Sequence, residues 1–384
     1  MPEARPPLVP ELRFPDFRDA GPWEVKRLGE LVETVTPPKK LQTSEYLPSG
    51  RFPIIDQSPS DVCGWTDDET ALVQADFPLV VFGDHSCVVK LADGPFAQGA
   101  DGIRILAPTS DIEARFLFLS LQADPIEQKG YRRHFSTLKE KQIPFPGKDT
   151  GEQQKIADCL SSLDDLIRAE EGRLEALRAH KTGLMQRLFP APGQTTPRLR
   201  FPEFQNAGPW EVKRLGEIAE INPSTGPLPP NFVYIDLESV VGGELVQKKH
   251  ISRKGAPSRA QRVLKVGDVI YQMVRPYQMN NLLFEMDDGQ EYVASTGYAQ
   301  LRAEGSSTFL YQLIHTTPFT NSVLEKCTGS NYPAISSSDL ADLRTRVPAL
   351  PEQQKIADCL TALDDLIRAQ GETIEALKTH KRGL

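Results

Sequence analysis

Residues 152–169 read EQQKIADCLSSLDDLIRA, and residues 352–369 repeat them as EQQKIADCLTALDDLIRA, with 16 of 18 positions identical. In both copies leucine and isoleucine recur at alternating steps of four and three residues, which is the heptad seam of a helix that pairs with another helix. The seam is too narrow for a helix buried in a core, and the first copy keeps it over about 55 Å of helix. We therefore predict two long spacer helices, at residues 152–190 and 352–384.

A second repeat lies outward from these helices. LRFPDFRDAGPWEVKRLGE at residues 12–30 returns as LRFPEFQNAGPWEVKRLGE at residues 199–217, with 16 of 19 positions identical. The segments between the repeats, residues 31–151 and 218–351, are unlike each other. Because near-identical segments alternate with dissimilar ones, the sequence favours a common frame that carries two different reader domains. A plain duplication whose loops have drifted is the less favoured alternative.

The divergent segments mix strand and helix patterns. LVVF and CVVKL on either side of Gly83-Asp84 predict a hairpin, and FVYID, VGDVIYQMV and YVASTGYAQL in the second half predict strands. DIEARFLFLSLQ in the first half and residues 307–327 in the second have helical periodicity. The predicted fold class is α+β: two pseudo-twofold-related globular domains, at residues 1–151 and 191–351, separated by an antiparallel two-helix coiled coil.

Charged residues in the two seams predict how the helices align, because polar seam pairs fix a register at some cost in stability. An antiparallel arrangement with residue numbers summing to 551 gives these pairs: Glu170 with Lys381, Lys181 with Gln370, Leu174 with Leu377, and Leu177 with Ile374. A register slipped by one heptad, with sums of 544, overlaps the helices more fully and is the alternative. The first copy continues after Leu184 as MQRLFP, whereas the sequence stops at Leu384, so we expect a shorter second helix and weaker assembly through it.

Composition and motifs exclude several classes of protein. The 384 residues carry a net charge of −8, contain no apolar run of the roughly 20 residues that cross a bilayer, and begin without a signal peptide, which predicts a cytoplasmic protein. The five cysteines are dispersed and form no CxxC pair, so neither a disulfide framework nor a cysteine-rich zinc site is expected. The sequence lacks a phosphate-binding loop, a dinucleotide fingerprint, HExxH and GxSxG, so we expect no catalysis and no cofactor bound by this chain.

One motif imitates a catalytic site. Asp16 with Glu24 and Lys26, and Glu203 with Glu211 and Lys213 in the second copy, resemble the carboxylates and lysine of metal-dependent nucleases. Short motifs of this kind match by chance, and this one lies in the near-identical frame. An amphipathic turn that packs its aromatic residues against the frame is the preferred interpretation.

Positive charge is concentrated in two segments, although the chain as a whole is acidic. Residues 244–277 carry a net charge of +6 and residues 129–141 a net charge of +4, and such segments suit phosphate contacts, although many are only solvated faces. Arginine, asparagine and tyrosine near them have the chemistry to read base edges. The candidate DNA-binding residues are Lys129, Arg132, Arg133, Lys139, Lys248, Lys249, Arg253, Lys254, Arg259, Arg262, Arg275, Tyr277, Asn331 and Tyr332.

The organisation as a whole resembles the specificity subunits of type I restriction-modification systems. The resemblance rests on LRFPxF and WExxxLGE opening each half, VGDVIY from Val266, STGY from Ser295, GSNYPAI from Gly329, and EQQKIA before each long helix. The first half has no clear counterpart of GDVIY or STGY, and it offers Gly83-Asp84-His85 and Gly102-Ile103-Arg104 instead.

The resemblance implies a function and partners. It implies two target-recognition domains, each reading one half of a bipartite sequence in double-stranded DNA, held apart by the helix pair. It also implies two copies of a modification subunit, which bind S-adenosylmethionine and methylate adenine, while restriction subunits add ATP-driven translocation and cleavage; the sequence leaves open whether a restriction subunit accompanies this chain. The alternative function is a bivalent protein-binding scaffold without DNA specificity.

Overall fold

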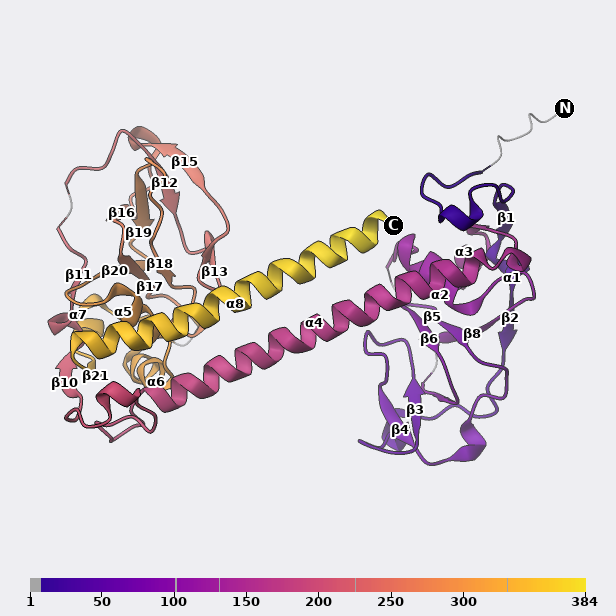
Figure 1. The fold of residues 1–384 in the computed structure, drawn as a ribbon, viewed down its shortest axis with the longest axis horizontal. Coiled ribbons are helices and arrows are strands. Elements are labelled where there is room, and N and C mark those ends of the chain that lie inside the picture. Colours follow the sequence, from indigo (N-terminus) through magenta and orange to yellow (C-terminus); the bar gives the residue numbers. More distant parts are fainter. Residues whose placement is uncertain (1–7, 101, 131, 225, 330) are drawn as a thin grey trace. The chain divides into compact units, whose positions relative to one another are not determined.

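The computed structural model describes residues 8–384 except 101, 131, 225 and 330, and it divides into two compact units (Figure 1). Unit 1 comprises the chain up to Glu170 together with Ile374–Leu384, and unit 2 comprises Glu171–Thr373. Two long helices, α4 (Glu152–Leu188) and α8 (Leu350–Gly383), each contribute one end to each unit. Within the described ranges, no helix is both long and apolar enough to cross a membrane.

Unit 1 is built on a four-stranded antiparallel sheet with the order β2-β8-β5-β6. Helix α2 packs on this sheet, and together they hold the larger core of the unit. A three-stranded sheet of order β4-β3-β7 and the two-stranded pair β1-β9 complete the unit. The predicted hairpin around Gly83-Asp84 is confirmed, because β5 and β6 pair antiparallel.

The elements of unit 1 besides the long helices have the following bounds: β1 (Glu24–Arg27), α1 (Leu28–Leu31), β2 (Val32–Val35), β3 (Phe52–Ile55), β4 (Gly64–Thr66), β5 (Leu79–Gly83), β6 (Val89–Ala92), β7 (Ala97–Gln98), β8 (Ile103–Pro108), α2 (Ala114–Ala123), α3 (Phe135–Lys139) and β9 (Gln142–Phe145).

Unit 2 repeats the first of these sheets and enlarges the second. The order β11-β20-β17-β18 corresponds to β2-β8-β5-β6, and the pair β10-β21 corresponds to β1-β9. The second sheet has four strands in the order β15-β12-β19-β16, and two of them, β15 and β16, come from the basic segment at residues 244–277. The divergence of the two halves is thus concentrated in the second sheets and the loops.

The elements of unit 2 have the following bounds: β10 (Glu211–Arg214), β11 (Ala219–Ile221), β12 (Asn231–Ile235), β13 (Val240–Val241), β14 (Glu244–Leu245), β15 (Lys249–Ser252), β16 (Ala260–Val263), β17 (Asp268–Gln272), β18 (Leu282–Leu283), β19 (Tyr292–Ser295), β20 (Tyr298–Ala303), α5 (Ser307–Ile314), α6 (Thr317–Lys326), α7 (Ser337–Ala341) and β21 (Arg344–Val347).

Two stretches that read as continuous patterns are broken in the structure. YVASTGYAQL forms two strands, β19 and β20, which belong to different sheets and are separated at Thr296-Gly297. The helical stretch at residues 307–327 forms two helices, because Thr316 caps α6 through its side chain and Pro318 lies in the first turn.

The near-identical repeats form one anchor in each unit. Arg13 donates two hydrogen bonds to the Glu152 carboxylate, at 2.8 and 2.6 Å, and Arg200 donates two to Glu352, at 2.7 Å each. These carboxylates are buried, and a bidentate pair fixes both position and orientation. The arginine of LRFP and the glutamate of EQQ therefore lock the start of each long helix to the segment that opens its own half.

The following glutamine completes the anchor. Gln153 donates to the carbonyl of Pro146 and accepts from the amide of Glu113, and Gln353 donates to the carbonyl of Pro348 and accepts from the amide of Ser306. Each glutamine thus ties the helix start to the end of a strand and to the segment before α2 or α5. The predicted α+β class, with long helices joining two domains, is confirmed.

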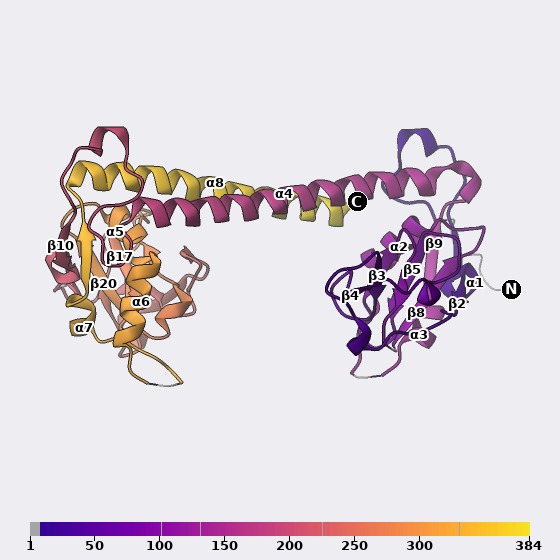
Figure 2. The ribbon, with the colours of Figure 1, turned by 90° about the horizontal axis from the view of Figure 1, so that it is seen from below.

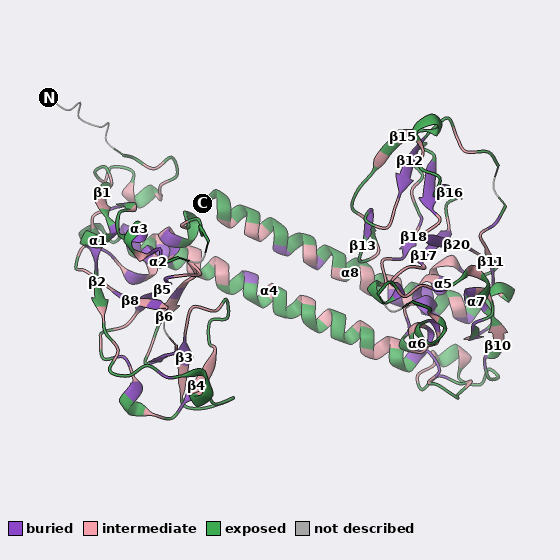
Figure 3. Cartoon of the chain, turned by 180° about the vertical axis from the view of Figure 1, so that it is seen from behind, coloured by how far each residue is buried: buried purple, intermediate pink, exposed green. Residues whose placement is uncertain are grey.

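Within each unit the long helices bury only a narrow stripe and expose the rest (Figure 3). In unit 1, the Lys381 ammonium lies 2.6 and 2.7 Å from the carboxylate oxygens of Asp164, and in unit 2 the Lys181 ammonium lies 2.6 Å from Asp364. The residue numbers in both pairs sum to 545.

These ion pairs correct the preferred register for the two lysines. The sum of 551 places Lys381 opposite Glu170 and Lys181 opposite Gln370, whereas each ammonium binds an aspartate six residues earlier on the facing helix. The physical reason is that the ammonium of a lysine at a seam position can reach a carboxylate that lies beside the seam of the facing helix. The alternative register, with sums of 544, places an aspartate there. The pairs Leu174–Leu377 and Leu177–Ile374 join residues of different units and stay predictions.

Candidate nucleic-acid interface

In each unit two loops meet at the end of the domain that lies away from the long helices (Figure 2). In unit 2 they are residues 273–281, after β17, and the described residues 327–329 and 331–336, before α7. Val274 bridges Ala334, and the Arg275 amide donates to the carbonyl of Pro333 at 2.7 Å. We call these two loops the loop pair of unit 2.

The loop pair of unit 2 presents an arginine stacked on a tyrosine. The guanidinium carbon of Arg275 lies 4.3 Å from the centre of the Tyr332 ring, which is the geometry of a cation–π contact. Tyr332 is 66% exposed and Tyr277 is 50% exposed, and Asn331 is exposed beside them. The structure therefore brings together four of the predicted residues.

Two buried amides hold the first of these loops in shape. Arg275 and Met279 have φ of 53°, in the left-handed region that costs energy for residues other than glycine. Gln272 accepts from the amide of Asn280 and donates to the carbonyl of Val274, while Asn281 accepts from the Gln272 amide. This network fixes the strained backbone before any ligand arrives. The sequence alone did not single out Gln272 or Asn281. The available signal was that polar residues end the strand pattern VGDVIYQ and follow Tyr277.

Unit 1 builds its loop pair differently, from residues 84–88 after β5 and the described residues 127–130 and 132–134 before α3. The amides of His134 and Phe135 each donate to the same oxygen of buried Asp84, at 2.9 Å. Arg104 reaches the other oxygen of Asp84, at 3.5 Å. These bonds place Lys129, Arg132 and Arg133 on an exposed loop.

Lys139 lies on α3 beside this loop. Its ammonium is 5.0 Å from the centre of the Phe135 ring, and its side chain is exposed. Tyr131, an aromatic residue within the basic segment, and Ser330, in the GSNYPAI run, lie outside the described residues.

The basic segment at residues 244–277 is spread over unit 2. Lys248 and Lys249 lie at the β15 edge of the second sheet, while Arg259 and Arg262 lie at the β16 edge. Arg253 and Lys254 follow β15 and are exposed, as is Arg259. Burial lowers the pKa of Arg262, because water no longer solvates its charge fully. Of this set, Arg259 lies near the start of the loop that carries Arg275, because its carbonyl accepts from the Thr296 amide while the Gly297 carbonyl accepts from the Met273 amide.

Two of the predicted lysines have carboxylate partners within the unit. Lys248 lies 3.1 Å from Asp288, and Lys249 binds Asp236. Hydrogen bonds to Tyr292 and Asp288 raise the pKa of Lys248, and the hydrogen bond to Asp236 raises that of Lys249. The net charge that the sequence assigns to this segment therefore overstates what is available to a phosphate.

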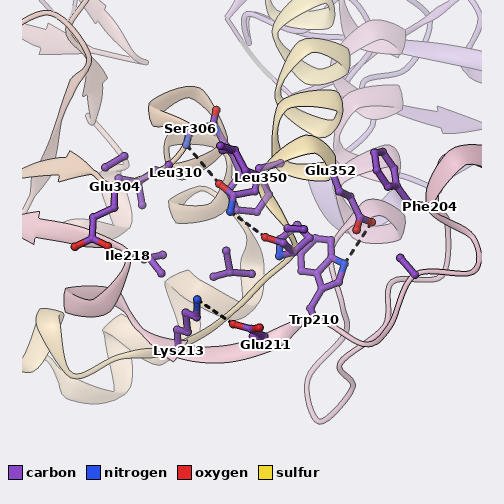
Figure 4. A pocket seen from close by; sticks show the side chains of 18 of the residues that line it. Phe204, Trp210, Glu211, Lys213, Ile218, Glu304, Ser306, Leu310, Leu350 and Glu352 are labelled. Atoms are coloured by element: carbon purple, nitrogen blue, oxygen red, sulfur yellow. Dashed lines mark hydrogen bonds and ion pairs between the residues drawn. The ribbon is translucent and has the colours of Figure 1, made fainter.

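The nuclease-like motif forms surface ion pairs. Lys26 lies 2.7 Å from Asp111 and 3.7 Å from Glu24. In unit 2, Lys213 lies 2.9 Å from Glu211 at the rim of a hollow that Trp210 and Glu352 also line (Figure 4). Among the described residues, no group of three histidine, cysteine, aspartate or glutamate side chains is placed to hold a metal ion.

Comparison with known proteins gives consistent matches. A curated relative, the HindI specificity subunit of Haemophilus influenzae, is 28% identical over 155 residues, which are 39% of this chain and only 33% of that protein. The MjaVIII specificity subunit of Methanocaldococcus jannaschii is 22% identical over 393 residues, covering 93% of this chain and 90% of that protein. The solved S subunit of a type I restriction-modification system from M. genitalium has the same fold, with a TM-score of 0.64 and 16% identity over 97% of each chain.

A family model described as the type I restriction modification DNA specificity domain matches twice, at residues 21–179 and 208–379. The two matches cover most of the chain and coincide with its two halves. The relatives are named specificity subunits, which agrees with the predicted targeting role without catalysis. The chain therefore belongs to the type I restriction-modification DNA specificity family and carries one such domain in each half of its sequence.

Proposed function

We propose that the chain reads a bipartite, asymmetric site on double-stranded DNA, one half with each unit, and directs an adenine methyltransferase to it. The observation that carries this proposal is that both units keep one frame and one Arg–Glu anchor, yet present different side chains at their loop pairs. Different loops on equivalent frames suit the recognition of two different half-sites.

The loop pair of unit 2 has the chemistry to read bases. An arginine guanidinium pairs with the two acceptors of guanine in the major groove, and an asparagine amide pairs with adenine. The stack on Tyr332 holds Arg275 in place, so less side-chain entropy is lost when it binds. Tyr277 and Asn331 extend the same exposed edge.

Phosphate contacts fall to the exposed cations of each unit. In unit 1 these are Lys129, Arg132, Arg133 and Lys139, and in unit 2 they are Arg253, Lys254 and Arg259. Such contacts position a protein on the duplex without reading its sequence. Lys248, Lys249 and Arg262 contribute less, because the first two have carboxylate partners and the third is half-buried.

The near-identical frame suits two copies of one protein partner. The repeated LRFPxF, GPWEVKR and EQQKIA segments give both units the same surface chemistry, and the net charge of −8 leaves much of the chain unsuited to nucleic acid. Two methyltransferase subunits, each with its own S-adenosylmethionine, would occupy these surfaces. Restriction subunits, where the system has them, would join the same complex.

Methylation profiling of DNA exposed to the chain and its cognate methyltransferase tests this proposal. The expected result is a split motif with modified adenines. Arg275→Ala should weaken recognition of one half of the motif by about ten- to a hundredfold, because a base contact is lost. Arg133→Ala in unit 1 should weaken binding to all sequences and reduce the salt slope by about one phosphate contact. Arg368→Ala, which removes a surface cation paired with Asp365 on α8, is the matched control.

The alternative function predicts a different outcome. A bivalent protein scaffold would show no preference for any duplex, and its affinity for DNA would not depend on both half-sites. Unchanged half-site preference in Arg275→Ala and Tyr332→Ala together would overturn the assignment of this loop pair.

A further inference from the structure

Arg104 lies at the start of β8, at the end of unit 1 where its loop pair is formed. It pairs with Phe82 across the sheet, two residues before the first loop begins at Asp84. The carbonyl of Gly102 accepts from the Asp84 amide at 2.6 Å, which ties the start of β8 to that loop. Arg104 therefore belongs to the same edge of the domain as the loop pair, although it lies outside the basic segment at residues 129–141.

The guanidinium of Arg104 lies over an aromatic ring. Its central carbon is 5.3 Å from the centre of the Phe135 ring, which is within the range of a cation–π contact. The Arg104 Nε is enclosed and has no acceptor in the described part of the chain, whereas 37% of the side chain is exposed. The arginine is thus packed against the domain at its inner edge and keeps donors that a ligand can reach.

Asp84 restrains this arginine without using up its donors. The Asp84 carboxylate is 3% exposed, and one of its oxygens accepts from the amides of His134 and Phe135, at 2.9 Å each. An Nη of Arg104 lies 3.5 Å from the other oxygen, which is longer than the about 2.7–2.9 Å of a strong charge-assisted hydrogen bond. The carboxylate therefore holds the guanidinium near the loop pair and leaves it free to donate elsewhere.

Unit 2 has the same arrangement from different positions in the chain. There the Arg275 guanidinium lies over a tyrosine ring at 4.3 Å, and its Nε is likewise enclosed without an acceptor among the described residues. Arg104 is the second residue of β8, and the second residue of β20 is the buried Ala299. Phe135 is the first residue of α3, and the first residue of α7 is Ser337. Because the sequence repeats neither residue, the duplicated frame does not explain the shared arrangement, whereas a common role beside the loop pairs does.

We propose that Arg104 is a base-reading residue of unit 1 and recognises a guanine in the half-site of that unit; this inference rests on the proposed function. Guanine presents two acceptors, N7 and O6, in the major groove, and the two Nη groups of one arginine match them. Phe135 and Asp84 hold the guanidinium before DNA arrives, so less side-chain entropy is lost on binding. The exposed cations of the adjacent loop supply phosphate contacts, which position the arginine but read no sequence.

The test uses the full chain with its cognate methyltransferase and the split motif of the wild-type complex. Arg104→Lys keeps a positive charge beside Asp84 but removes the planar fork that pairs with two acceptors. In the half of the motif that Arg275→Ala leaves intact, Arg104→Lys should lower the preference for a G·C pair at one position by about tenfold or more. Arg115→Lys changes another arginine of unit 1 that is paired with an aspartate, Asp93, and as the matched control it should leave the motif unchanged.

Modified DNA gives a second readout that a purely structural role would not change. 7-Deazaguanine lacks the N7 acceptor, so at that position it should weaken binding of the wild-type chain by about tenfold and add little to the loss in Arg104→Lys. Equal losses from 7-deazaguanine in both proteins, or a loss in Arg104→Lys that is the same for all sequences, would overturn the proposal. Arg104 would then contact a phosphate or only neutralise Asp84.

A further variant keeps the test decisive if Arg104→Lys does not fold. Phe135→Leu retains the arginine but removes the ring beneath it, and it should weaken the same base preference to a smaller extent. The outcomes also separate this inference from the proposed function. If the wild-type complex shows no split motif, the proposed function fails and the role of Arg104 with it. If Arg275→Ala relaxes one half of a split motif and Arg104→Lys leaves the other half unchanged, only the role of Arg104 is rejected.

Discussion

Leu160 and Leu360 occupy the same position in the two repeats but have different surroundings. The anchors beside them are equivalent, since Arg13–Glu152 and Arg200–Glu352 have the same bidentate geometry and near-complete burial. Leu360 is nevertheless fully buried under Leu188 and Phe189, whereas Leu160 faces a groove that Trp23 and Phe116 also line. Identical sequence therefore fixes the hydrogen-bonded anchor but not the burial of the helix that follows it.

A second contrast concerns the second sheets and the loop pairs of the two units. The first sheets of the two units share a strand order, while the second sheets differ in strand number and the loop pairs differ in their polar networks. Asp84 organises the loop pair of unit 1, and Gln272 and Asn281 organise that of unit 2. Different buried polar groups thus shape the equivalent exposed edge in each domain.

The largest expected effect tests the contrast in burial. Leu360→Ala should destabilise unit 2 by about 2–5 kcal/mol, because it leaves a cavity in a closed core. Leu160→Ala should cost less than half as much, since its side chain is only half-buried and faces an open groove. Calorimetric unfolding of both variants measures the difference, and equal losses would show that the groove is closed in solution.

Acid should weaken unit 2 more than unit 1. Burial lowers the pKa of His315 below 6.5, and the neutral ring donates to the Tyr311 carbonyl at 2.7 Å and lies 3.2 Å from the Asn281 amide. The unfolded chain therefore takes up a proton near pH 6.5 that the folded chain refuses. The stabilising contribution is complete above pH 6.5 and is lost as the pH falls towards the folded pKa, at no more than about 1.4 kcal/mol per pH unit.

Unit 1 has Gln122 at the position equivalent to His315, so it supplies an internal reference. Unfolding of each unit between pH 7 and pH 5, followed by hydrogen exchange, measures the pH dependence. His315→Gln should remove the extra acid sensitivity of unit 2. If the stability of unit 2 still falls more steeply with acid than that of unit 1 in this variant, another titrating group is the cause.

The smallest effect concerns the helix seams. Lys381→Ala in unit 1 and Lys181→Ala in unit 2 should each cost only about 0.2–1 kcal/mol, because these ion pairs are partly exposed and water screens them. A double-mutant cycle of Lys381 with Asp164 measures the coupling between them. A coupling with Glu170 larger than that with Asp164 would restore the register that sums to 551.

Much of the architecture was predictable from local patterns. Heptad spacing predicted the long helices, alternating strands around Gly83-Asp84 predicted a hairpin, and the repeats predicted two domains on one frame. These features depend on residues close together in the chain or on direct comparison of its halves. The sequence named Arg275 and Tyr332, which the structure brings into contact, but it did not name the amides that hold the loop of Arg275 in shape. The DNA-binding role of these residues stays a prediction.

The sequence by itself determined the repeated frame, the helical periodicity and the family of this protein, because each of these is written in the order of neighbouring residues. Only the tertiary structure decided that Lys248 and Lys249 are paired with Asp288 and Asp236, that the seam lysines bind Asp164 and Asp364, and that one groove is filled while its counterpart is open. The physical reason is that ion pairing and burial depend on distances between side chains far apart in the chain. Identical residues acquire different surroundings when the segments packed against them differ.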